Sequence, residues 1–203
     1  PVTVPTQDMV LGSYYLTLVK DGEPGEGKVF RDVNEALMAY QEGVVGLHAP
    51  IRVRMTKELG GKKMSKLIDA TVGRLIFNEP IPQDLGYVDR SNSENLFNLE
   101  VSFLVGKKQL GQIIEKCIKV HGTAKTAEVL DKIKAQGFKY STRGAITVAV
   151  CDAVIPPQKK ELLAAAEEKI EKITRQYKRG LISNDERYNQ VIKTWDETTK
   201  KVS

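Results

Sequence analysis

The chain has 203 residues, of which 41% are hydrophobic and 28% are charged, and its formal net charge is +5. This length suffices for one or two domains with a hydrophobic core, and the composition is typical of a soluble globular protein. The apolar runs are too short to span a bilayer and no secretory signal is visible, which argues against a membrane or secreted protein. Cys117 and Cys151 lack metal or disulfide spacing, so we expect small buried residues of a cytoplasmic protein.

Both ends of the sequence lead us to expect a piece of a longer chain. Residues 2–4 are strand-like, with no earlier segment to pair with. The last helical pattern still runs at residues 200–202, with no glycine or proline to stop it.

The first 43 residues predict two short helices separated by a loop. Thr6 is the expected N-cap of a helix that runs to about Tyr15. Glycines and a proline make residues 20–28 a loop. Asp32 then caps a second helix, which Gly43 ends.

A β region follows. Apolar and polar residues alternate over 51–56, which predicts a half-buried strand. The glycine pair at 60–61 predicts a turn, and residues 64–70 can return as the partner strand. We expect a short helix over 72–78 and a further strand over 96–105.

Positive charge gathers in this β region. Six basic residues and one acidic residue lie between Arg52 and Lys66. Such a segment favours a phosphate or nucleotide nearby, whereas the alternative is a solvated hairpin surface.

Two helices and a strand are expected next. The first helix carries an apolar stripe over 110–118 and ends at Gly122. Thr123 caps the second, which Gly137 closes. Alternating residues over 146–150 predict a strand.

The paired prolines Pro156 and Pro157 mark the clearest boundary, because only one glycine, Gly180, follows them. Gly180 can end one helix, and Ser183 with Glu186 forms a capping box that opens another. The two expected apolar stripes are Leu162, Ala166, Ile170, Ile173 and Tyr177, and Tyr188, Ile192, Trp195 and Thr199. Two striped helices joined by a short turn fold back on each other, so we predict an antiparallel two-helix coiled coil.

Several segments, spread over most of the chain, have a recognisable order and spacing. They are Val4-Pro5-Thr6-Gln7-Asp8-Met9-Val10-Leu11-Gly12, Tyr14-Tyr15-Leu16-Thr17, Leu47-His48-Ala49, Ile51-Arg52-Val53-Arg54, Thr71-Val72-Gly73-Arg74, Ile76-Phe77-Asn78, Gly137-Phe138, Tyr140-Ser141-Thr142-Arg143, residues 152–156, and Glu186-Arg187-Tyr188-Asn189. Together they resemble the beta-prime subunit of bacterial DNA-directed RNA polymerase. Ala145 and Ala149 stand where that family is expected to have glycines.

The resemblance implies an α+β fold, with a mixed α/β pore domain followed by a protruding antiparallel two-helix coiled coil. Residues 1–17 would be the tail of the double-psi barrel that houses the active centre. Residues 18–155 would form the pore domain lining the secondary channel, and residues 156–203 the rim-helix hairpin at the channel mouth.

The resemblance also implies a non-catalytic structural part of a nucleotidyltransferase. The family's magnesium-binding aspartate motif is absent from this sequence. We therefore expect no catalytic or metal-binding residue and no cofactor here, with Mg²⁺ bound elsewhere in the whole enzyme and this part inactive alone. The implied partners are the beta, alpha, omega and sigma subunits, DNA template, RNA and nucleoside triphosphates, together with Gre-type cleavage factors and DksA-like regulators. The implied location is the cytoplasm, in association with the nucleoid.

Two groups of candidate residues follow. Gln7, Arg74 and Arg143 could face nucleotide or RNA in the channel; the alternatives are helix capping for Gln7 and carboxylate pairing for the arginines. At the hairpin tip, charged residues and exposed apolar residues meet in a place that has no core to enter, which favours docking of a factor over a solvated turn. The tip residues are Lys178, Arg179, Leu181, Ile182, Asn184 and Asp185.

A second function remains open from the sequence. The chain could be an independent module with a basic β-hairpin for RNA and a coiled-coil arm for a partner protein. That alternative predicts salt-dependent RNA binding by the isolated chain.

Overall fold

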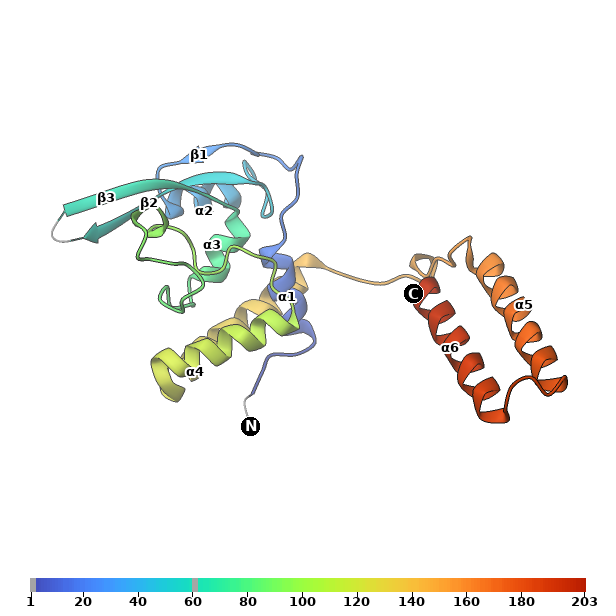
Figure 1. Cartoon of the computed structure of the whole chain (residues 1–203). Coiled ribbons are helices and arrows are strands. Elements are labelled where there is room, and N and C mark those ends of the chain that lie inside the picture. The colour runs from blue at the N-terminus through green and yellow to red at the C-terminus, as the bar shows by residue number, and fades with distance from the viewer. Residues whose placement is uncertain (1–2, 60–61) are drawn as a thin grey trace. The chain divides into compact units, whose positions relative to one another are not determined.

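The computed structural model describes residues 3–59 and 62–203 and has the expected α+β architecture (Figure 1). Contacts divide the chain into two units, Pro1–Ile146 and Thr147–Ser203. The functional borders expected after residues 17 and 155 stay predictions. The elements are α1 (Asp8–Thr17), β1 (Val29–Phe30), α2 (Val33–Gln41), β2 (Ile51–Leu59), β3 (Lys62–Ala70), α3 (Val72–Asn78), η1 (Ser93–Asn95), α4 (Lys107–Gly144), η2 (Val150–Asp152), α5 (Lys159–Lys178) and α6 (Asn184–Val202).

The first unit contains a small sheet in the order β1-β2-β3. β1 runs parallel to β2, and β2 pairs antiparallel with β3, with Ile51 opposite Ala70, so the predicted hairpin is confirmed. The turn predicted at residues 60–61 lies outside the described residues, as does residue 2 of the strand predicted at 2–4. Thr3 and Val4 are not in a strand.

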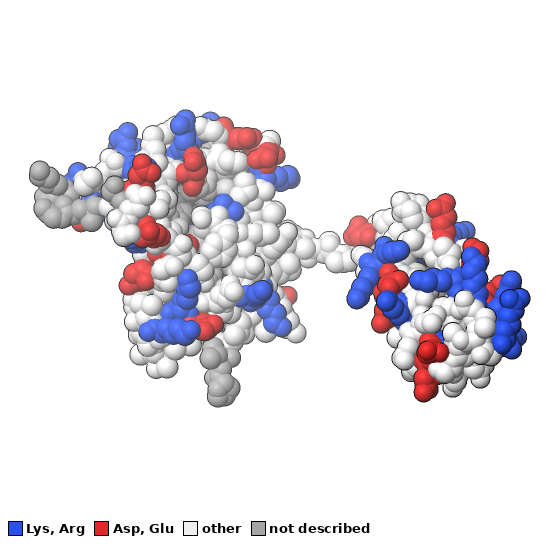
Figure 2. All heavy atoms as spheres, viewed as in Figure 1, with Lys and Arg blue, Asp and Glu red and all other residues white. Residues whose placement is uncertain are grey.

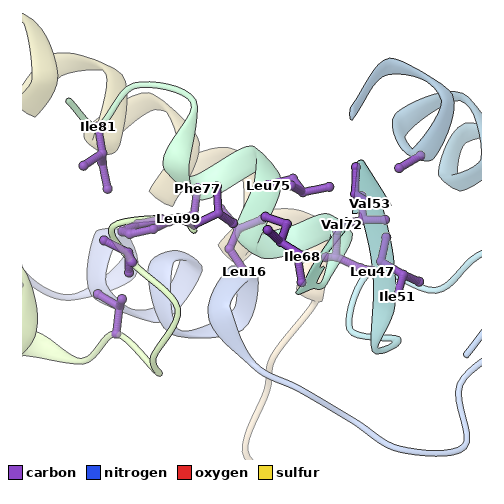
Figure 3. Packing of buried hydrophobic residues seen from close by; sticks show 14 of the residues in the cluster. Leu16, Leu47, Ile51, Val53, Ile68, Val72, Leu75, Phe77, Ile81 and Leu99 are labelled. Atoms are coloured by element: carbon purple, nitrogen blue, oxygen red, sulfur yellow. The ribbon is translucent and has the colours of Figure 1, made fainter. Parts of the chain in front are cut away.

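The core of this unit joins the sheet to α1 and α3. Leu16 of α1, Val53 of β2 and Phe77 of α3 are all fully buried (Figure 3). Gly73 lets α3 approach closely, because a side chain there would overlap the Leu16 carbonyl oxygen, and the Gly73 amide donates a hydrogen bond to the Leu47 carbonyl at 2.9 Å. The core thus fixes the carboxyl end of α1 against α3.

Side-chain caps begin α2 and α3, of which only the cap at Asp32 was predicted from the sequence. The Asp32 side chain accepts from the Glu35 amide, as predicted, and that of Thr71 accepts from the Arg74 amide. The prediction for Thr6 was wrong, because the N-cap of α1 is Gln7 and no side chain caps this helix. Backbone carbonyls supply the local bonds instead.

The strand predicted over 96–105 was wrong, because this segment has no regular secondary structure. Hydrogen bonds to side chains hold it instead. The Asn78 amide group pairs with Val101, donating to its carbonyl at 2.8 Å and accepting from its amide at 3.0 Å. The fully buried Glu100 carboxylate pairs with Arg90 at 3.1 Å. Side chains therefore satisfy backbone groups that a neighbouring strand would otherwise bind.

Helix α4 combines the two helices expected from the sequence. Gly122 interrupts it with a left-handed φ of 74°, as its position predicted. The expected end at Gly137 was wrong, because the helix continues to Gly144. Gly137 instead allows α4 to touch α1, since a Cβ atom at Gly137 would lie 2.7 Å from the Met9 Cα, and one at Gly12 would overlap the Gly137 carbonyl.

The strand predicted over 146–150 was also wrong. Ala145 ends α4 in the left-handed region, with φ 47° and ψ 37°. The residues that follow are irregular apart from η2, and no strand pairs with them in the described part of the chain. Val148, Val150, Val154 and Ile155 are 72–95% exposed.

The second unit is the predicted antiparallel helical hairpin, in which α5 and α6 pack along each other. With 20 and 19 residues, the helices are each about 30 Å long. Ala166 and Ile173 of α5 are buried as expected, and Lys169 pairs with Glu197 across the helices at 3.8 Å. No described helix is long and apolar enough to cross a membrane.

The stripe expected on α6 was wrong by one residue position. Thr194 and Thr198 are buried, whereas Tyr188, Ile192 and Trp195 are 37–60% exposed. Each buried threonine hydroxyl donates to the carbonyl four residues earlier, at 2.8 Å. The small, internally bonded threonines can therefore occupy the interface without an unpaired polar group.

Candidate functional site

The hairpin tip is a closed and well-bonded turn. Gly180 adopts φ 73°, and its amide donates to the Tyr177 carbonyl at 2.9 Å. The Leu181 amide donates to the Gln176 carbonyl at 3.0 Å, which completes a Schellman motif. Ser183 and Glu186 form the predicted capping box that opens α6. The tip backbone is therefore fixed before any partner binds.

The side chains of the predicted tip residues point mostly to solvent. Leu181 is 69% exposed, whereas Ile182 is half-buried. The side-chain oxygen of Asn184 accepts a hydrogen bond from Arg187 at 2.8 Å, so this oxygen is already bonded within the hairpin. The remaining exposed tip residues are Lys178, Arg179 and Asp185.

A cation–π contact beside the tip was not predicted from the sequence. The Arg187 guanidinium lies 5.2 Å from the centre of the Tyr177 ring and also donates to Asn184. This contact joins α5 to α6 beside the turn. The pairing of an arginine with a tyrosine near Gly180 is the sequence feature that could have indicated it.

Gln7 lies at the start of α1 in an uncommon backbone conformation, with φ 51° and ψ −124°. Its carbonyl accepts from the Val10 and Leu11 amides at 3.0 Å, while its exposed side chain caps nothing. Non-glycine residues in such regions carry strain, which often marks functional positions. The side chain is thus presented to solvent by a strained turn.

Arg74 is half-buried in α3 and bonds to backbone rather than to an acid. Its Nε donates to the Thr17 carbonyl at 3.2 Å, at the carboxyl end of α1. No carboxylate within the described residues forms an ion pair with it. Burial lowers the pKa of the guanidinium from its usual value, although the group stays charged at neutral pH. The expected carboxylate partner is replaced by a helix end, where a cation is favoured.

Arg143 is exposed in the last turn of α4, with its guanidinium 5.8 Å from the centre of the Tyr140 ring. Burial raises the pKa of the Tyr140 hydroxyl, an effect that Arg143 opposes. Arg143 also lines a groove with Lys132 and Lys139.

The three channel candidates do not form one site. Gln7 and the Thr17 carbonyl that binds Arg74 lie at opposite ends of α1, about 15 Å apart along its axis. Arg143 is nearer the carboxyl half of α1, since a Cβ at the neighbouring Gly144 would lie 3.3 Å from the Tyr15 ring.

Part of the basic β-hairpin has a structural role. Lys57 donates to the Leu96 carbonyl and Lys66 to the Glu94 carbonyl, both at 2.6 Å. Burial lowers the pKa of Lys57. Arg52 and other basic residues remain exposed on this strand pair, and Figure 2 shows basic and acidic residues interspersed over each unit.

The magnesium that the resemblance implies for the whole enzyme does not fit the described residues of this chain. No three histidine, cysteine, aspartate or glutamate side chains among them gather closely enough to hold a metal ion.

Comparisons with known proteins show which protein family this chain belongs to. Residues 1–153 match the family model described as RNA polymerase Rpb1, domain 3. Over all 203 residues the chain is 61% identical to DNA-directed RNA polymerase subunit beta' of Acetivibrio thermocellus, 60% to that of Clostridium acetobutylicum and 59% to that of Caldanaerobacter subterraneus. The chain therefore belongs to the beta-prime subunit family of bacterial RNA polymerase. It spans 17% of the length of each of these relatives.

Proposed function

We propose that this chain is a non-catalytic structural part of the beta-prime subunit within a DNA-dependent RNA polymerase of the cytoplasm. It lines the secondary channel, through which nucleoside triphosphates enter and backtracked RNA leaves. Its hairpin tip docks Gre-type cleavage factors and DksA-like regulators. In this role the chain works with the beta, alpha, omega and sigma subunits and with DNA and RNA.

The observation that carries the docking role is the exposed Leu181 on a rigid turn. A Schellman motif and a capping box hold the turn, so a partner pays little conformational entropy to bind it. Arg179, which is exposed near Leu181, belongs to a residue type that is enriched among interface hot spots.

Two single residues support the channel role. Gln7 presents its side chain from a strained turn, and Arg74 holds a desolvated cation without a carboxylate partner in the described chain. Both features occur often at functional positions.

The docking role is tested with a Leu181→Ser, Arg179→Ala polymerase. Loss of a buried leucine contact alone weakens binding by roughly tenfold or more, so we expect a clear rise in the Kd of a Gre-type factor. Basal RNA synthesis is expected to stay nearly unchanged.

The matched control is Lys160→Ala, Lys200→Ala, which removes exposed charge from the other end of the hairpin. Both proteins are titrated with fluorescent factor, and basal transcription is measured in parallel. Equal factor affinity in the tip variant and the control would refute the docking role.

A further inference from the structure

A small pocket of about 200 Å³ lies within the first unit, beside the carboxyl half of β2. Lys57 of β2 is half-buried and lines this pocket. Glu79 lines it too, but its side chain is exposed and forms no ion pair with Lys57 in the described part of the chain. The apolar residues of the lining come from four segments and are Val33, Met55, Leu75, Phe97 and Leu99.

Lys57 shares a hydrogen-bond acceptor with a second cation. Its Nζ donates to the Leu96 carbonyl oxygen at 2.6 Å, and a guanidinium nitrogen of Arg90 donates to the same oxygen at 2.8 Å. The fully buried Glu100 carboxylate holds Arg90 in this place through an ion pair at 3.1 Å. Two positive charges that converge on one carbonyl oxygen lie close enough to repel each other.

Only Lys57 can relieve this repulsion by losing a proton, because an arginine stays protonated in proteins. Burial and the Arg90 charge both lower the pKa of Lys57, an effect that Glu100 opposes. An amine that is desolvated by apolar neighbours, or that lies next to another cation, is the kind of lysine that acts as a nucleophile in proteins. Lys57 meets both conditions.

We infer that Lys57 is a modification site, at which a short acyl group from an acyl phosphate or an acyl thioester becomes attached to Nζ. The lone pair of the neutral amine attacks the carbonyl carbon of the donor, and a C–N bond forms. The phosphate or the thiolate leaves with the electrons of the broken C–O or C–S bond, and Nζ releases one proton to solvent. The product amide carries no charge beside Arg90, and its remaining N–H can still donate to the Leu96 carbonyl.

Lys66 of β3 provides a matched comparison on the same strand pair. Its Nζ also donates to a backbone carbonyl at 2.6 Å, that of Glu94. Lys66 is exposed and is not among the residues that line the pocket, and no second cation of the described chain donates to the Glu94 carbonyl. The two lysines therefore differ in the apolar pocket and the neighbouring cation, but not in their type of hydrogen bond.

The test uses polymerase assembled with the beta-prime subunit that contains this chain. Limiting acetyl phosphate, acetyl coenzyme A or butyryl coenzyme A is added in separate arms, and acylation of Lys57 and Lys66 is followed by mass spectrometry. We expect Lys57 to be acetylated roughly threefold or more faster than Lys66 in at least one acetyl arm, and the two arms tell the phosphate donor from the thioester. The ratio of butyrylation to acetylation by the thioesters should be roughly threefold or more higher at Lys57, because the longer chain can contact the apolar lining.

An Arg90→Gln, Glu100→Gln variant removes the neighbouring cation together with its carboxylate partner, so that no buried charge is left unpaired. Acetylation of Lys57 in this variant should fall toward the rate at Lys66. If the variant does not assemble into polymerase, the ratio of butyrylation to acetylation in the unaltered enzyme still decides.

The matched control is Lys119→Gln, Glu115→Gln, which removes an exposed ion pair of α4 and should leave the reactivity of Lys57 unchanged. The inference is overturned if Lys57 reacts no faster than Lys66 with both acetyl donors, or if the butyryl-to-acetyl ratio is equal at the two lysines. It is also overturned if Lys57 reacts equally fast in the Arg90 variant and in the control.

Discussion

Replacing Gly137 by alanine tests the close contact between α1 and α4. Alanine favours a helix over glycine by about 1 kcal/mol, so the substitution would stabilise an open helix position. At Gly137, however, the new Cβ would lie 2.7 Å from both the Cα and the carbonyl oxygen of Met9. Backbone atoms cannot rotate away, and overpacking of this kind costs about 1–3 kcal/mol.

The matched control is Gly111→Ala in the same helix, where an added Cβ meets nothing within 4 Å. Both variants share the gain in helix propensity, so the difference between their unfolding free energies isolates the packing cost. We expect Gly137→Ala to be about 1–3 kcal/mol less stable than Gly111→Ala in urea denaturation followed by circular dichroism. Equal stability of the two variants would refute the contact.

Two further predictions concern backbone strain and pH. Ala145 holds φ 47° at the end of α4, so Ala145→Gly should raise the unfolding free energy by about 1 kcal/mol, measured by urea denaturation; a loss would contradict the left-handed cap. Burial lowers the pKa of His48, an effect that Glu23 and the Leu18 backbone oppose. Below pH ~6.5 the unfolded chain therefore binds more protons than the folded chain. The titration of His48 then lowers the free energy of unfolding by up to about 1.4 kcal/mol per pH unit as the pH falls. His48→Phe, which keeps the edge-on contact with Tyr15, should lose less stability than the wild type between pH 7.5 and 5.5, and equal losses would show that His48 is not the titrating group.

The sequence was sufficient where local rules decide the structure. Asp32 caps α2, and Ser183 opens α6, because each side chain satisfies amides of its own first turn. The alternation over 51–56 predicted β2, since one face of that strand meets the core. Gly180 closes the hairpin for the same kind of local reason.

The sequence was insufficient where distant contacts decide. Gly137 resembles a helix end, yet its missing side chain serves the approach of α1. Thr194 and Thr198 read as polar positions, although their hydroxyls are satisfied within the helix and they occupy the interface. Residues 96–105 have strand composition, but bonds such as those between Asn78 and Val101 hold them without a sheet.

The candidate site was likewise predictable only in part. The tip residues could be identified because a turn between two helices must expose its centre. The basic groove beside Arg143 could not, because Tyr40 and Glu79 reach it from segments far away in sequence. Lys132 and Lys139 share its wall only once α4 is known to continue past Gly137.

The irregular segment after Ala145 has a practical consequence for work with this chain in isolation. Val148 and Val150 alternate with small residues and are 85% and 95% exposed, and Val154 and Ile155 follow close behind. Uncharged, β-prone stretches such as residues 145–151 are the usual starting points of aggregation. Preparations of the chain without the rest of its subunit will self-associate first through these valines, so a solubilising substitution belongs there rather than on the hairpin.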